Sequence, residues 1–188
     1  MTLPAIHREL LTPDGMAAAR RALINRFPWF VHVGNLADFE SYQEHGLRPR
    51  NPGMRPPPCF AAAIRGLGAD PDNIVCFWPI AAHDARPRRP DGRRFQMALA
   101  GEFLPALVGL DWSYGTAVEI AQVLRDEFPD APFDWIFAEA VRRRGSVVSY
   151  LPIPAPALRV CAVGCPENDP AAWPRLVDTD RRNVIAFE

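Results

Sequence analysis

The chain has 188 residues, of which 48% are apolar and 23% charged, a size and composition typical of one globular domain. Its formal net charge is −1, so no overall basic field points to a nucleic-acid-binding protein. Proline is enriched, with 21 residues where the usual frequency of ~5% gives about 9. We therefore expect a single domain over residues 1–188 with many stiff loops.

The sequence predicts neither a membrane-spanning helix nor a metal centre. No apolar run approaches the ~20 residues of a membrane helix, and MTLPAIHRELLTPDG has no charged leader before an apolar core. These features predict a cytoplasmic protein without a membrane partner. The four cysteines include no Cys-x-x-Cys pair and the four histidines are scattered, which favours buried thiols over a metal centre.

The first elements are predicted by helix signals and by one apolar strand. Thr12 and Pro13 are typical of an N-cap and a first helical residue. The alanine-rich segment 16–27 that follows is predicted to be a helix, which Pro28 ends. The β-branched and aromatic run WFVHV, residues 29–33, predicts a buried strand.

A second helix and a long loop are expected next. Asn35 is predicted to cap this helix and Gly46 to end it. Residues 48–59 contain five prolines and are expected to form an irregular loop. The apolar stripe of the helix consists of Leu36, Phe39 and Tyr42.

The rest of the chain, from residue 73 onward, is predicted to contain more strands than helices. The clearest amphipathic helix is GTAVEIAQVLRDEF, residues 115–128. Together with the early helices, these strands predict a mixed α+β domain. The candidate strands are NIVCFWPI, RFQMALAG, DWIFAEAV, SVVSYLPI, LRVCAVG and NVIAFE.

Glu139 lies among apolar residues in FDWIFAEAVRRRG. A carboxylate is costly to bury without a partner. Two interpretations fit: a strand edge in a cleft, where the carboxylate can do chemistry, or a helix face where it pairs with Arg142 or Arg143.

Glycine-rich nucleotide loops, His-Glu-x-x-His and Gly-x-Ser-x-Gly are absent. Their absence argues against a nucleotide hydrolase, a zinc protease and an esterase.

A local basic segment, RPRRPDGRR, interrupts the otherwise neutral chain. Its guanidinium groups could contact a nucleic-acid backbone, with Trp78 or Phe95 nearby to stack on a base. The alternative is a solvated surface hairpin. The candidate nucleic-acid-binding residues are Arg88, Arg89, Arg93 and Arg94.

Three segments, in order, carry a resemblance to a known family. They are FVHVGNLADFESYQEHGLRP, the aromatic strand NIVCFWPIAA, and FAEAVRRRGSVVSYLPIPAPALRVCAVG. Over residues 29–165 they resemble ADP-ribosyltransferases of the DarT toxin type. The resemblance implies an α+β fold of two packed small sheets, with N-terminal helices around an NAD+ cleft.

The resemblance also implies roles for individual residues, with NAD+ as the substrate and no metal. His32 would hydrogen-bond the adenine-side ribose, and Glu139 would be catalytic, stabilising the oxocarbenium-like centre. Arg48 and Arg50 would reach the diphosphate, unless they belong to a solvated basic loop. The implied cofactor-binding residues are His32, Gly34, Asn35, Arg48, Arg50, Phe77 and Trp78.

Two departures from the family pattern bear on function. Pro79 is followed by Ile-Ala-Ala, so the arginine of the family's turn is missing. Phe137 stands where arginine-modifying transferases carry an acidic residue or glutamine. The missing arginine favours a module without turnover. The resemblance itself implies a mono-ADP-ribosyltransferase, a toxin or phage-defence effector with an antitoxin as partner. Phe137 disfavours an arginine acceptor, and together with the basic segment it favours single-stranded nucleic acid. The alternatives are a protein-modifying transferase and a non-catalytic NAD-binding or protein-interaction module.

Overall fold

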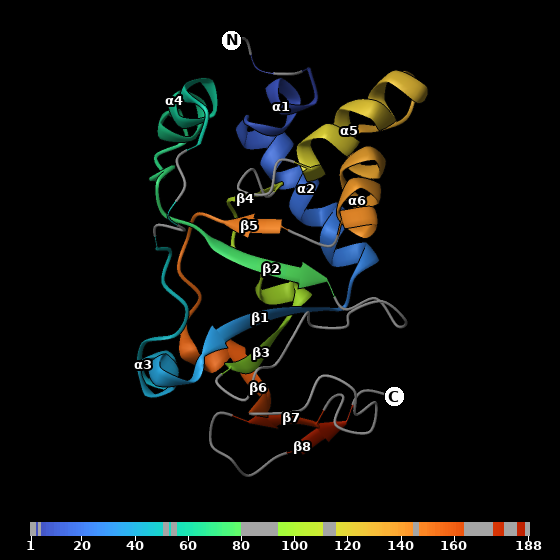
Figure 1. Cartoon of the computed structure of the whole chain (residues 1–188). Coiled ribbons are helices and arrows are strands. Elements are labelled where there is room, and N and C mark those ends of the chain that lie inside the picture. Colours follow the sequence, from blue (N-terminus) through green and yellow to red (C-terminus); the bar gives the residue numbers. More distant parts are fainter. Residues whose placement is uncertain are drawn as a thin grey trace.

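The computed structural model describes residues 3, 5–50, 53, 56–79, 94–110, 116–144, 147–163, 175–178 and 184–186. These residues form one antiparallel sheet with helices gathered mainly at one end (Figure 1). The strand order is β4-β5-β2-β1-β3-β6-β7-β8. The mixed helix and strand architecture is confirmed. The described strands join in a single sheet, whereas two small sheets were expected.

Two helices precede the sheet. α1 spans Ala5–Leu10 and α2 spans Pro13–Arg26. Thr12 caps α2 as predicted, because its Oγ1 accepts a hydrogen bond from the backbone N–H of Gly15 at 3.0 Å. Proline at the first position loses no hydrogen bond, since that N–H has no partner inside a helix. The helix α1 was not predicted.

The central strand β1, Trp29–Asn35, determines how the sheet is assembled. It pairs with β3, Arg94–Ala100, along its full length and with β2, Val75–Pro79, on its other side. The strand therefore lies in the interior of the sheet, and its Phe30 and Val31 side chains are buried. The remaining strands are β4 (Val108–Leu110), β5 (Val147–Ser149), β6 (Leu158–Val163), β7 (Arg175–Asp178) and β8 (Val184–Ala186).

The core lies where the helices pack on the β4, β5, β2 and β1 side of the molecule. Figure 1 shows α1, α2, α5 and α6 together there, with α3 near the end of β1 and β7–β8 at the opposite end of the sheet. Large side chains from the sheet and the helices pack against one another and are fully buried. Burial of each one stabilises the fold by about 1.5–3 kcal/mol. Among them are Leu23, Phe30, Phe77, Leu99, Ile136 and Phe137.

The segment around Glu139 is a helix, so the strand predicted for DWIFAEAV is wrong. α5, Thr116–Glu127, agrees with the prediction, and α6, Phe133–Arg144, packs against α5 and α2. The apolar residues of α6 recur at helical spacing, which buries one side against these two helices. These buried residues are Ile136, Phe137, Ala140 and Val141.

Two further differences concern the segment after β1. A short 3₁₀ helix, η1 (Leu36–Asp38), precedes α3 (Phe39–His45), and Asn35 Oδ1 accepts from the N–H of Ala37 at 3.1 Å. The expected loop 48–59 ends early, because α4 spans Pro58–Gly66. Pro57 is the N-cap of this helix and Pro58 its first residue, positions where a missing N–H is tolerated.

Candidate functional site

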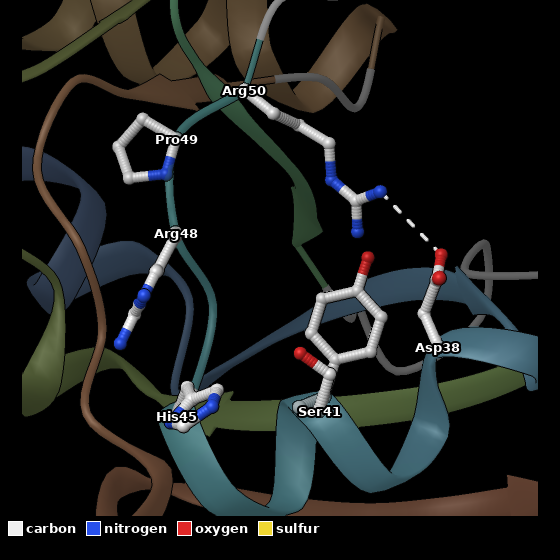
Figure 2. Close-up of a pocket in the computed structure, with 8 residues that line it drawn as sticks. Asp38, Ser41, His45, Arg48, Pro49 and Arg50 are labelled. Carbon is white, nitrogen blue, oxygen red and sulfur yellow. Dashed lines mark hydrogen bonds and ion pairs between the residues drawn. The ribbon is translucent and has the colours of Figure 1, made fainter.

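A pocket of about 200 Å³ opens between α3 and the chain segment that follows it (Figure 2). The polar residues of η1 and α3 that contribute to it recur every three to four positions, so one helical face supplies them. The segment after α3 supplies the opposite side. The lining residues are Asp38, Ser41, Tyr42, His45, Gly46, Arg48, Pro49 and Arg50.

Backbone pairing fixes the second side of this pocket. Gly46 has φ 72°, and a Cβ there would collide with the carbonyl oxygen of Ile153. The N–H of Leu47 then donates to that oxygen at 2.9 Å, and Arg50 exchanges two backbone hydrogen bonds with Ile74, each 3.1 Å long. Arg48 lies between these two isolated β-bridges, which fix the backbone on either side of it.

Arg50 is the cation that the structure places over the pocket's aromatic surface. Its guanidinium carbon lies 5.1 Å from the centre of the Tyr42 ring, and its Nη1 lies 3.4 Å from Asp38 Oδ2. Figure 2 shows the Arg50 and Arg48 side chains extending in different directions from the same segment. The lining therefore carries two guanidinium groups and one carboxylate, an excess of positive charge suited to an anion.

His32 is connected to this pocket through Tyr42. The two ring centres are 5.9 Å apart, and His32 Nδ1 lies 2.9 Å from the carbonyl oxygen of Cys76. Burial lowers the pKa of His32 to about 4, against a smaller raising effect of that hydrogen bond. The ring is therefore neutral at physiological pH. Since a carbonyl only accepts, Nδ1 carries the proton and Nε2 is the acceptor atom.

The other implied cofactor residues are not among those that line the α3 pocket. The ring centres of Phe77 and His32 are 6.0 Å apart, but Phe77 is 1% exposed and belongs to the core. Trp78 is partly buried and points to the other face of β2, because successive strand residues alternate. Gly34 is buried and Asn35 is exposed at the end of β1. Burial of Phe77 argues against a stacking role for its ring.

Glu139 lies in an arginine cluster on the helices, so of its two interpretations the strand edge is wrong. Its two oxygens accept from Arg142 at 2.8 and 2.6 Å, Oε1 also accepts from Arg143 at 3.0 Å, and Arg26 of α2 lies 3.6 Å away. Hydrogen bonds from Arg142, above all, lower the pKa of Glu139 to about 2. The helical alternative considered for Glu139 therefore describes its surroundings.

Among the described residues, the contacts of Glu139 differ from those of His32. Those of Glu139 come from α6 and α2. Those of His32 come from β2 and α3. A carboxylate 7% exposed and held by three guanidiniums has the surroundings of a structural ion-pair residue. Its catalytic role stays a prediction that this geometry does not favour.

Several expectations lie outside the described residues. Arg88, Arg89 and Arg93 are among them, and Arg94 begins β3 with its side chain not described. Within the described part of the chain, no group of three metal-binding side chains comes together.

The pocket also contains residues that sequence reasoning did not select. Asp38, Ser41 and His45 received no binding role, and Tyr42 was assigned to an apolar stripe. The signal that could have found them is their spacing of three to four residues, which places them on one face of η1 and α3.

The described helices include none long and apolar enough to cross a membrane. The chain matches no family model, no curated protein and no solved structure.

Proposed function

We propose that the protein binds NAD+ with its diphosphate in the α3 pocket, and that NAD+ is the substrate of mono-ADP-ribosyl transfer. The supporting observation is the guanidinium of Arg50 over the Tyr42 ring, with the neutral imidazole of His32 against the same ring. A guanidinium fork matches two phosphate oxygens. The imidazole Nε2 can accept from a ribose hydroxyl.

Binding requires Arg50 to exchange one anion for another. Asp38 and Arg50 are 45% and 58% exposed at the side chain, and ion pairs so exposed contribute about 0–1 kcal/mol. A diphosphate with two negative charges can therefore replace Asp38 at Arg50. Arg48 is exposed and can turn toward the second phosphate.

The proposed activity rests on the resemblance described above. The bond between nicotinamide and ribose breaks, nicotinamide leaves, and a nucleophilic atom of the acceptor forms the new bond to the ribose carbon. Nucleic acid is the acceptor proposed, through the arginines of residues 86–94, and an antitoxin is the protein partner proposed. In this account Glu139 is released from its arginine cluster when it acts.

A second candidate function is favoured by Glu139 itself. Three guanidiniums neutralise this carboxylate and hold it on α6, which suits an NAD+-binding module without turnover. Both candidates use the same pocket. They differ only in whether nicotinamide is released.

Calorimetric titration with NAD+ tests the shared part of the proposal. Arg50→Gln should weaken binding about tenfold or more, because a charge-assisted contact is lost. Arg65→Gln is the matched control: Arg65 also faces an exposed carboxylate, Asp72, at 3.5 Å. Equal affinities of the wild type and both variants, or no binding to the folded wild type, would overturn the proposal.

Labelled NAD+ then separates the two candidates. Release of nicotinamide with label on an oligonucleotide supports the transferase, and label on protein alone replaces the acceptor. NAD+ binding without nicotinamide release supports the binding module.

A further inference from the structure

The turn between α5 and α6 displays an aromatic pair to solvent. Phe128 and Trp135 are 46% and 39% exposed, and their rings meet edge to face with centres 5.5 Å apart. Figure 1 shows this turn at the upper right, on the far side of the molecule from α3. Large aromatic groups exposed together are uncommon on a surface without a partner.

Acidic residues accompany this pair in the sequence. Residues 126–135, DEFPDAPFDW, contain four acidic residues and no lysine or arginine, whereas the whole chain has a net charge of only −1. None of the four forms an ion pair with another described residue, and all four are exposed. They are Asp126, Glu127, Asp130 and Asp134.

The acidic residues at the end of α5 are not explained by helix stability. The C-terminal turn of a helix carries partial negative charge and favours cations, yet α5 ends with Asp126 and Glu127. Its one basic residue there, Arg125, holds the backbone of the turn and pairs with Glu9 at 2.8 Å, and it forms no ion pair with these carboxylates among the described residues. The placement is therefore locally unfavourable in the isolated chain, and a cation brought by a partner would relieve it.

The turn is held in a fixed shape. Arg125 Nη1 donates to the carbonyl oxygens of Pro129 at 3.3 Å and Ala131 at 2.8 Å. The N–H of Ala131 donates to the carbonyl of Phe128 at 3.1 Å. A surface preorganised in this way loses little conformational entropy on binding.

We propose that this aromatic and acidic turn is a docking surface for a basic segment of a partner protein. The aromatic faces take aliphatic stems and cationic heads of lysine or arginine, and the four carboxylates supply the complementary charge. The same carboxylates repel nucleic acid and anionic lipid. The surface is independent of the α3 pocket and of NAD+.

The test uses the full chain and a short dye-labelled peptide that alternates arginine and leucine. Fluorescence anisotropy should give saturable binding that weakens as salt rises. A peptide with glutamate in place of arginine should not bind. In NMR spectra the indole N–H of Trp135, identified by its loss in Trp135→Phe, should shift more than the other four indoles.

Substitutions on the turn should weaken peptide binding about tenfold. One variant is Trp135→Gln. A second combines Asp126→Asn, Glu127→Gln and Asp130→Asn, and it should also flatten the salt dependence. Asp134 is left unchanged because its Oδ1 accepts from the N–H of Trp135.

The chain offers a matched control. Glu102 and Phe103 are an exposed carboxylate and an exposed aromatic side by side in the 3₁₀ helix η2, Gly101–Phe103. Glu102→Gln with Phe103→Gln should leave the affinity unchanged within about twofold. Circular dichroism confirms that each variant is folded.

Three results would overturn the proposal. One is equal binding of the peptide by wild type and both turn variants. Another is equal binding of the glutamate peptide. The third is self-association of the wild type, measured by sedimentation, that is abolished in Trp135→Gln. That result would mean that a second copy of the chain, and not a basic partner, binds the turn.

Discussion

Replacement of Glu139 by Gln should lower the free energy of unfolding by about 2 kcal/mol at neutral pH. The amide keeps the shape of the side chain but removes the charge that holds three guanidiniums. A carboxyl pKa that falls from 4.5 to about 2 corresponds to about 3 kcal/mol at 1.36 kcal/mol per pH unit. The arginine side chains are 42–46% exposed, so screening by water reduces this to about 2 kcal/mol.

The sign of the pH dependence follows from the direction of the pKa shift. The pKa of Glu139 is lower in the folded chain than in the unfolded chain. The stabilisation is therefore complete above the unfolded pKa of 4.5 and is lost as the pH falls toward about 2. Wild type and Glu139→Gln should converge in stability over this acidic range.

Urea unfolding followed by circular dichroism measures this difference. A double-mutant cycle with Arg142→Gln should give a coupling of about 1 kcal/mol or more, because these side chains share two hydrogen bonds. Glu9→Gln serves as the control. Glu9 pairs with Arg125 at 2.8 Å but is 44% exposed, so its loss should be under about 1 kcal/mol.

The structural account of Glu139 can be refuted in two ways. A loss below about 0.5 kcal/mol at neutral pH, or a loss that persists unchanged in acid, would show that the cluster contributes no charge-dependent stability. A Glu139→Gln variant with wild-type stability and NAD+ affinity, but without nicotinamide release, would instead support the catalytic role implied by the family resemblance.

Three further predictions concern the buried histidine and the pocket. His7 is fully buried, neither ring nitrogen has a hydrogen-bond partner among the described residues, and burial lowers its pKa from 6.5 to about 4. The free energy of unfolding should therefore fall as the pH drops from 6.5 toward 4. In urea unfolding, the decrease between about pH 7 and pH 5 should be about 2 kcal/mol smaller for His7→Leu than for the wild type. Equal decreases in the two proteins would contradict this. Asp38→Asn should raise NAD+ affinity up to about fivefold in calorimetry by releasing Arg50, and lower affinity would show that Asp38 helps to bind the ligand. Gly46→Ala should destabilise the chain by more than about 2 kcal/mol and abolish NAD+ binding, whereas Gly68→Ala, at φ 78° with open space around it, should cost only the ~1–2 kcal/mol of backbone strain; similar thermal shifts for the two would refute the role of the collision.

Interactions between neighbouring residues are enough to predict several elements of this fold. Thr12 caps α2 because its hydroxyl reaches an N–H three residues away. Gly46 ends α3 because its backbone conformation suits glycine. The strands β1 and β2 follow from short β-branched and aromatic runs. Each of these signals is local, so it is readable without knowledge of the fold.

The tertiary structure decided what the local pattern left open around Glu139. WIFAEAVRRR is apolar enough for a buried strand and periodic enough for a helix. Packing against α2 and α5 selects the helix. That choice, together with Arg26 from a distant part of the chain, places the carboxylate in a guanidinium cluster.

The pocket was also decided only by tertiary structure. Tyr42 could be recognised from sequence as an apolar helix residue, but its contacts with His32 and Arg50 depend on how α3 lies against β1 and against the following segment. Backbone pairing of Leu47 with Ile153 and of Arg50 with Ile74 brings together segments about 100 and about 25 residues apart. Such pairings join segments that are distant in the chain, so the family resemblance pointed to Arg48 and Arg50 but not to the surface they share.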